Sequence, residues 1–278
     1  MKNAIAIIQA RMSSSRLPGK VMLPLAGRPI VWHVWDRASR CKEVEEVIVA
    51  TSTDISDDAI ALYCQEQGIN CYRGSLDNVL DRFLKVVEMH PAQYVVRITC
   101  DCPLIHPPLI DAQLRAVREF DGDIVWCADT GDALEGQGVI SVRALKYAEQ
   151  HSDDPDDLEH VGSVFTTKNP LAFRIVEFQP QPELIVHGLR LTVDEYKDYI
   201  LMSRIYEELW SEACGVPLLD ALAWLRDHPE IASMNAQIQH KDLNKQAVEL
   251  RRKWTDIPKI GTWVMGQSDE LCQSKNTN

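Results

Sequence analysis

The sequence of 278 residues contains no uninterrupted apolar run near the roughly eighteen residues that span a bilayer. It also lacks a CxxC pair, because its eight cysteines are scattered, and this gives no support to a zinc ribbon or a thioredoxin-type site. Met1–Gln9 has neither the basic flank nor the length of a signal peptide. We therefore expect a cytoplasmic protein that does not enter membranes and whose cysteines are mostly small buried apolar residues.

Positive charge is in deficit, with 29 Lys and Arg against 41 Asp and Glu and a formal net charge of −12. This mean charge repels phosphate backbones, which argues against a general nucleic-acid binder or an anionic-membrane binder. Residues 1–40 depart from the mean, because they hold seven basic side chains and a single acid, Asp36. The cations of this segment therefore require a local explanation.

Short β-branched runs alternate with amphipathic segments in the first half of the chain. The expected strands are Ala4–Gln9, Val44–Ser52, Tyr94–Thr99 and Asp123–Cys127, and the expected helices are Pro29–Arg40, Ser56–Gln67, Ser75–His90 and Pro107–Phe120. This alternation predicts an α/β fold with a doubly wound, mostly parallel sheet.

The pattern changes after about residue 128. We expect helices at Arg143–Gln150, Glu195–Glu212, Pro217–His228 and Leu243–Trp254, and strands at Ala172–Phe178 and Gly188–Thr192. We interpret residues 130–185 as an insertion beside the sheet, used for substrate binding or dimerisation. No linker separates two domains, so residues 1–240 are predicted to form one domain, followed by a helical extension with a frayed tail at 241–278.

The loop after the first strand, Gln9–Lys20, is rich in phosphate-oxygen donors. It holds Arg11, Arg16 and Lys20 together with three serines and a glycine. Arginine forks, a lysine point charge and main-chain amides can together surround a phosphate. The loop is neither a Walker A motif nor GxGxxG. A phosphate site is favoured over a merely solvated basic loop, because ligands of open α/β sheets bind at the carboxyl ends of strands.

Two carboxylates are candidates for a metal site. Asp101 follows a central strand, and Asp194 follows a predicted strand just before a helix. Magnesium bound to a triphosphate prefers one or two carboxylates plus phosphate oxygens. The alternative for Asp194 is a helix N-cap. Cys100 and Cys102 could contribute thiols to a metal, but packing beneath a turn is favoured.

At this point the sequence resembles a known family, through blocks that follow one another in the family's order. These blocks are Gln9-Ala10-Arg11, Ser15 to Lys20, Val49 to Ser52, Asp57-Asp58, Arg73-Gly74-Ser75 with Asp77, Val79-Leu80 and Arg82, Arg97-Ile98-Thr99, Asp101 to Ile105, Glu159-His160-Val161, and Arg190 with Thr192-Val193-Asp194. They resemble the cytidylyltransferase superfamily that makes CMP-activated sugars, in particular its spore coat polysaccharide biosynthesis (SpsF) branch, and they imply its Rossmann-like nucleotidyltransferase fold.

The resemblance implies a role for each block. The nucleotide is bound by Gln9, Ala10, Arg11, Ser14, Arg16 and Lys20 on the phosphate side, and by Ala50, Thr51, Ser52, Arg73 and Thr99 around the cytidine. Lys20, Arg16 and Arg11 are the implied catalytic residues, Asp101 and Asp194 the implied Mg²⁺ ligands, and Glu159, His160 and Arg190 the implied acceptor contacts. A homodimer formed through residues 130–185 is also implied.

The implied function is CTP-dependent nucleotidyl transfer to a sugar, a sugar acid or a phosphonate, with release of pyrophosphate, for surface polysaccharide biosynthesis. The chain departs from the family pattern at Cys100, His106, Leu158 and residues 134–138, mostly on the acceptor side. A nucleotide-sugar-dependent glycosyltransferase is one alternative, although Asp101-Cys102-Pro103 lacks the second Asp of its usual metal motif. A catalytically silent CTP-binding partner protein is the other, motivated by Cys100 and the missing acceptor-side acids.

Overall fold

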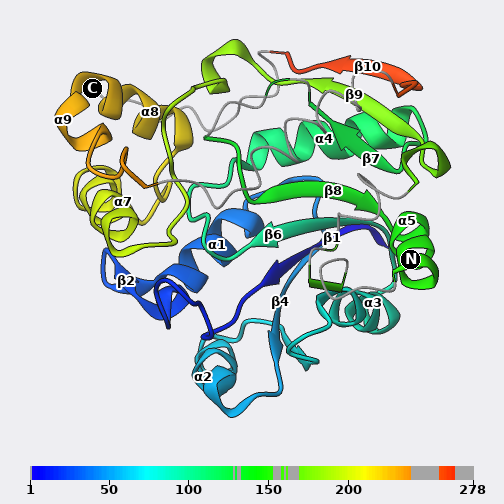
Figure 1. The fold of residues 1–278 in the computed structure, drawn as a ribbon, viewed down its shortest axis with the longest axis horizontal. Coiled ribbons are helices and arrows are strands. Elements are labelled where there is room, and N and C mark those ends of the chain that lie inside the picture. Colours follow the sequence, from blue (N-terminus) through cyan, green and yellow to red (C-terminus); the bar gives the residue numbers. More distant parts are fainter. Residues whose placement is uncertain are drawn as a thin grey trace.

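The computed structural model describes residues 2–127, 129, 133–152, 158–159, 161, 169–238 and 257–266. Within them, eight strands form one sheet in the order β10-β9-β7-β8-β6-β1-β4-β5 (Figure 1). The strands are β1 (Lys2–Gln9), β4 (Glu46–Ser52), β5 (Cys71–Gly74), β6 (Ala92–Thr99), β7 (Ile124–Trp126), β8 (Gln137–Ser141), β9 (Ile175–Gln179) and β10 (Gly261–Val264), and β2 (Pro24–Leu25) and β3 (Arg28–Pro29) form a separate pair.

Strand β1 lies in the interior of the sheet, parallel to both β4 and β6. Ile7 is opposite Ile48 on one side and Arg97 on the other. Strand β8 is antiparallel to β6 and β7, whereas β7, β9 and β10 are parallel to one another. The doubly wound, mostly parallel sheet is thus confirmed.

Helices cover both faces of the sheet. The helices are α1 (Ile30–Ser39), α2 (Asp58–Gln67), α3 (Val79–Met89), α4 (Pro107–Glu119), α5 (Val142–His151), α7 (Tyr196–Leu209), α8 (Leu218–Asp227) and α9 (Pro229–Ala232). One core cluster packs α1, α2, α4, α7 and α8 against Ala4, Ala6 and Ile8 of β1. A second cluster packs α3 and α5 against Ile5 and Ile7, which point to the opposite face of the sheet. Because successive strand side chains point to opposite faces, the uniformly apolar β1 can fill both clusters.

Local capping determines where several helices begin and end. The side chain of Asn78 accepts a hydrogen bond of 2.8 Å from the Asp81 amide, so α3 begins at Val79, later than the predicted Ser75. Gly68, at φ 67°, takes the left-handed conformation that ends α2, as predicted. No helix among the described residues combines the length and apolarity that crossing a bilayer requires.

Three expectations about the second half of the chain need correction. Residues 130–185 do not lie wholly beside the sheet, since β8 and β9 pair within it. Gly188–Thr192 is not a strand: its Arg190 carbonyl accepts a hydrogen bond from the Asn235 side chain and not from a neighbouring strand. The extension adds strand β10, which was not predicted, whereas the predicted helix at residues 243–254 lies outside the described residues.

A buried histidine makes the fold sensitive to acid. His106 precedes α4 and is 6% exposed, and no described group pairs with its Nε2. Burial, with help from the Arg37 guanidinium, lowers the pKa of His106 to about 3. The folded state therefore keeps this imidazole neutral at pH values where the unfolded chain protonates it, and stability falls as the pH drops below about 6.5.

Replacing His106 with asparagine should remove this dependence. Between pH 7 and pH 5 the free energy of unfolding of the wild type should fall by about 2 kcal/mol more than that of His106→Asn. Urea denaturation at a series of pH values measures this difference, and exposed His187→Asn is the matched control. Parallel curves for wild type and His106→Asn would contradict the assignment.

Candidate functional site

The β1 loop (residues 9–20) is held in a fixed conformation at the carboxyl end of β1. Gly19 has φ 74°, a conformation that favours glycine, and its amide donates to Met12 O at 2.9 Å. The Met12 amide donates at 2.7 Å to Asp57, a fully buried carboxylate that also accepts from the Ser52 amide at 3.1 Å. Asp57 therefore joins this loop to the end of β4. Asp57 belongs to one of the blocks that resemble the family, but the resemblance implies no role for it.

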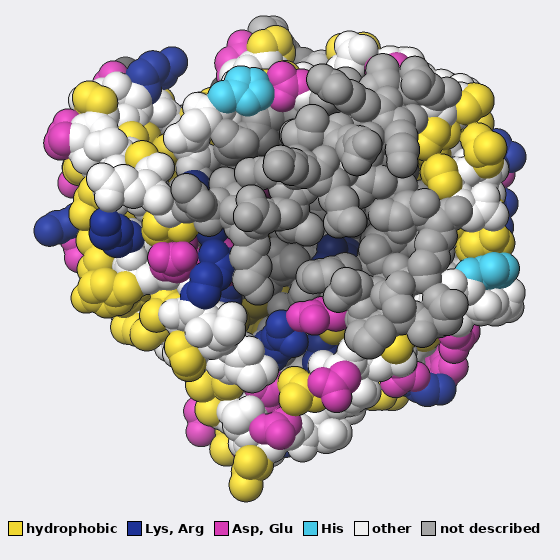
Figure 2. Space-filling model, viewed as in Figure 1, with side chains coloured by type: hydrophobic (Ala, Val, Ile, Leu, Met, Phe, Trp, Pro, Cys, Tyr) yellow, Lys and Arg dark blue, Asp and Glu magenta, His cyan; other side chains and the backbone are white. Residues whose placement is uncertain are grey.

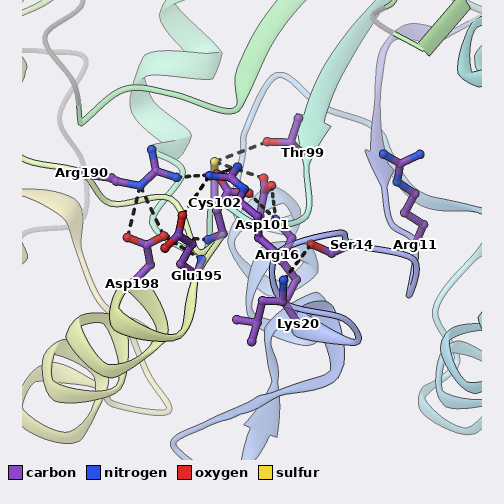
Figure 3. A network of polar contacts seen from close by, with 12 residues as sticks. Arg11, Ser14, Arg16, Lys20, Thr99, Asp101, Cys102, Arg190, Glu195 and Asp198 are labelled. Atoms are coloured by element: carbon purple, nitrogen blue, oxygen red, sulfur yellow. Dashed lines mark hydrogen bonds and ion pairs between the residues drawn. The ribbon is translucent and has the colours of Figure 1, made fainter. Parts of the chain in front are cut away.

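Lys20 is at the centre of the site, between the two predicted metal ligands. Its Nζ lies 2.7 Å from Asp101 Oδ2 and 2.8 Å from Asp194 Oδ1, and the residue is 7% exposed (Figure 3). Burial alone would lower the pKa of Lys20, but the two carboxylates outweigh it and raise the pKa. The ammonium group is consequently charged at neutral pH.

Asp194 lies beside Asp101 because Val193 donates its amide to Asp101 O at 2.8 Å. Its second oxygen contacts Arg16 Nη2 at 2.7 Å and also the Arg190 guanidinium. Burial alone would raise the pKa of Asp194, but Lys20, Arg16 and Arg190 outweigh it and lower the pKa. Asp194 is therefore an ionised carboxylate in the site, and the N-cap position of the following helix, α7, is occupied by Glu195.

A buried network behind the site fixes Asp194. Asp198 is 1% exposed and accepts from the amides of Asp194 and Glu195 at 3.0 and 2.9 Å, from Asn235 at 2.8 Å and from Arg190 at 3.2 Å. Arg190 is thus engaged by two carboxylates, and it is not among the residues that line the cleft described below. Asp198 carries no local motif, and only its capping position at the start of α7 could have suggested it.

The two carboxylates suit a divalent cation that takes most of its ligands from water and phosphate. Asp101 and Asp194 converge on one point from two segments of chain, and Asp194 is ionised. Magnesium prefers such a small protein contribution, of one or two carboxylates. No cluster of three or more potential ligands occurs in the described part of the chain, so a fully protein-enclosed metal centre is not found there.

Cys100 and Cys102 pack beneath the turn at the end of β6. Both are buried, and burial raises the pKa of each thiol. Protonated thiols are poor metal ligands, since the thiolate is the binding form. This supports packing over the metal-binding alternative.

A cleft of about 490 Å³ opens in front of these groups. Figure 2 shows Lys and Arg side chains recessed in the middle of this face of the molecule. The residues around the cleft are Gln9, Ala10, Arg11, Ser14, Ser15, Arg16, Lys20, Val21, Val79, Arg82, Arg97, Thr99, Cys100, Asp101, Glu159 and Asp194. The structure therefore brings together the β1 loop, both predicted metal ligands, Thr99 and Glu159.

Arg11 lies apart from the cluster of Lys20, Asp101 and Arg16 (Figure 3). Its Nη2 lies 2.6 Å from Glu159 Oε1, so one implied phosphate contact pairs with one implied acceptor contact. His160 lies outside the described residues.

Four residues implied around the cytidine are not among the residues that line the cleft. Ala50, Thr51 and Ser52 are fully buried in β4. Arg73 donates to the carbonyls of Ser52 and Asp54 at 2.8 and 2.9 Å and pairs with Asp58. On this side the cleft is instead lined by Val79 and Arg82 of α3 and by Arg97, whose Nε donates to Gln9 Oε1 at 3.0 Å.

The chain is similar over most of its length to known proteins. The chain is 30% identical over 238 residues to the spore coat polysaccharide biosynthesis protein SpsF of Bacillus subtilis, covering 84% of this chain and 98% of SpsF. It is 32% identical over 237 residues to the uncharacterized protein MJ1063 of Methanocaldococcus jannaschii, covering 85% of this chain and 96% of that protein.

A solved cytidylyltransferase structure from Leptospira borgpetersenii has the same fold. It superposes with a TM-score of 0.77 at 24% sequence identity, covering 86% of this chain and all of the other. Residues 5–215 match the sequence description of the family named Cytidylyltransferase. That match includes the β1 loop, both carboxylates and most of the sheet, and the chain belongs to the cytidylyltransferase family.

Proposed function

We propose that this protein transfers the cytidylyl group of CTP to an acceptor oxygen and releases pyrophosphate. The observation that carries the proposal is the convergence of Lys20 from the β1 loop on Asp101 and Asp194, in a cleft that Arg11 and Arg16 also line. Cations placed beside carboxylates can hold a triphosphate together with a divalent ion.

In the proposed reaction an acceptor oxygen attacks the α-phosphorus in line. A new bond from phosphorus to that oxygen forms while the bond from phosphorus to the bridging oxygen breaks, and pyrophosphate takes up the bonding electrons. When the acceptor is a hydroxyl, its proton passes to water. Arg16 and Lys20 bind phosphate oxygens and balance the charge that develops on them, so catalysis rests on positioning and electrostatics. Asp101 and Asp194 would hold Mg²⁺, which would supply further neutralisation of the phosphoryl oxygens.

We propose an acceptor of the sugar, sugar-acid or phosphonate class. The name of the SpsF relative supports a role in surface polysaccharide biosynthesis. Glu159 lines the cleft and pairs with Arg11, so an acceptor that bound Arg11 would compete with Glu159. The homodimer through residues 130–185 stays a prediction.

Pyrophosphate release measured with each of the four nucleoside triphosphates, a panel of acceptors, and Mg²⁺ present or absent tests the function. We expect release only when CTP, Mg²⁺ and a suitable acceptor are combined. Sugar transfer from a finished nucleotide-sugar, without pyrophosphate release, would instead support a glycosyltransferase. Tight binding of CTP with no turnover on any acceptor would support a silent partner protein.

A further inference from the structure

Asn235 is a buried polar residue that the proposed reaction does not use. It is 2% exposed and lies in the turns that follow α9, beyond the residues 5–215 that match the family. Its Nδ2 donates to the Arg190 carbonyl at 3.0 Å and to Asp198 Oδ1 at 2.8 Å. An amide nitrogen carries two hydrogens, so both donors of Asn235 are committed to these two groups.

The segment that carries Asp194 has no strand ladder to hold it. Residues 189–194 form neither a helix nor a strand. Buried backbone groups outside a ladder need other partners. Near one end of the segment the Arg190 carbonyl accepts from Asn235. At the other end the Asp194 amide donates to Asp198 at 3.0 Å. The position of the Asp194 carboxylate therefore depends on side chains from outside the segment.

Asn235 connects the two ends of this segment. Asp198 Oδ1, to which Asn235 donates, also accepts from Arg190 Nε at 3.2 Å. The Arg190 guanidinium in turn contacts the Asp194 carboxylate. Hydrogen bonds to a buried carboxylate are strong and reinforce one another. A loss of Asn235 should therefore reach Asp194 by two routes, through the Asp198 side chain and through the backbone of Arg190.

The packing of α9 holds Asn235 in place. Helices α7, α8 and α9 contact one another and lie together at the left of Figure 1. Ile231 and Ala232 of α9 pack against the core cluster to which α7 contributes. In the turns that follow, the Ile238 amide donates to the Asn235 carbonyl at 2.9 Å. These contacts fix Asn235 relative to α7, the helix that carries Asp198.

We propose that Asn235 is a positioning residue that holds the Asp194 carboxylate toward Asp101 and so raises the affinity of the pair for a divalent cation. This inference rests on the proposed function, because it takes these two carboxylates as the ligands of the ion. Partners behind a metal ligand set its orientation, and their loss typically costs 10- to 100-fold in metal affinity or activity. The segment after residue 215 thereby completes a site whose two carboxylates lie within the family match.

Asn235→Leu tests the assignment on the full chain, because leucine has a similar volume and no hydrogen-bond donor. The Mg²⁺ concentration for half-maximal pyrophosphate release should rise by roughly 10- to 100-fold. At saturating Mg²⁺, kcat should approach the wild-type value. Without metal, amide hydrogen exchange followed by mass spectrometry should be faster in the peptide that spans residues 190–198, because that segment loses an anchor.

Two controls separate positioning from stability. Asn70→Leu is the matched control, because Asn70 is an exposed asparagine that donates to Glu46 at the amino ends of the strands. Ser141→Ala removes a buried cap of α5 and reports the effect of lower stability alone. Both should keep the wild-type Mg²⁺ requirement. Asn235→Ser retains one donor and serves if the leucine variant does not fold, with a smaller rise in Mg²⁺ requirement expected.

A folded Asn235 variant with the wild-type Mg²⁺ requirement would overturn the assignment even if it unfolded at lower urea, because Asn235 would then contribute to stability alone. An equal rise for Ser141→Ala would overturn it too. If the wild type released no pyrophosphate from any nucleoside triphosphate, the proposed function would fail, and hydrogen exchange would still decide the role of Asn235. Faster exchange of residues 190–198 would support the positioning of Asp194, and unchanged exchange would refute it.

Discussion

Lys20→Met is expected to lower kcat for pyrophosphate release by about 10²–10³, the cost of removing one preorganised charge donor from a reacting oxyanion. Lys20 is the side chain that both candidate metal ligands contact, at 2.7 and 2.8 Å. Methionine retains the buried apolar stem and removes only the ammonium group, so a change in rate reports the charge and not the packing.

The Mg²⁺ dependence of this variant separates two roles for Lys20. Without the ammonium, Asp101 and Asp194 face each other with one cation fewer, and a divalent ion should bind them at least as tightly as in the wild type. The Mg²⁺ concentration for half-maximal activity should therefore stay equal or fall while kcat falls. A steady-state Mg²⁺ titration measures both quantities.

Lys85→Met provides the matched control, because Lys85 is an exposed helix lysine that pairs only with the neighbouring Glu88 in the described contacts. Its kcat should equal that of the wild type. If Lys20→Met turned over at the wild-type rate while remaining folded by circular dichroism, the catalytic assignment of Lys20 would be wrong.

The parts of this fold that the sequence predicts are those determined by local pattern. The β-branched runs of β1, β4 and β6 and the caps and stop signals of the helices act over a few residues. The short β5 carries an arginine and a glycine in four residues, and β10 depends on pairing with β9, which is distant in sequence. Pairings of that kind are decided by tertiary packing and leave little local trace.

The candidate site also contains residues that a local pattern indicates and residues that only the folded chain brings together. The proximity of Lys20 to Asp101 could be predicted, because both follow neighbouring strands whose carboxyl ends meet at one edge of the sheet. Asp194 was also predicted there, but the strand expected before it does not form. Arg82 was matched to the family without a role, although it is a buried charge one turn after Val79 on the strongly apolar face of α3. Asp198 gave less warning, because its role depends on Arg190 and Asn235 arriving from separate parts of the chain.

Asp101→Asn is the second substitution with a large expected effect, and it should differ in kind from Lys20→Met. The amide is nearly isosteric but neutral, so the variant keeps the shape of the site and removes one of two carboxylates from the cation. We expect kcat/KM to fall by about 10³, in line with the loss of one strong electrostatic contact to a phosphoryl transition state. The Mg²⁺ concentration for half-maximal activity should rise.

Asp194→Asn should likewise lower kcat/KM and raise the Mg²⁺ concentration for half-maximal activity. It should also loosen the contacts of Arg16 and Arg190, which share the second oxygen of Asp194. Exposed Asp227→Asn, at the end of α8, is the control for an aspartate-to-asparagine change outside the cleft. Opposite shifts in Mg²⁺ requirement for Lys20→Met and Asp101→Asn would show that the ammonium and the divalent ion share the same two carboxylates. If Asp101→Asn left the Mg²⁺ requirement unchanged, Asp101 would be a partner of Lys20 alone and the metal site would have to be sought elsewhere.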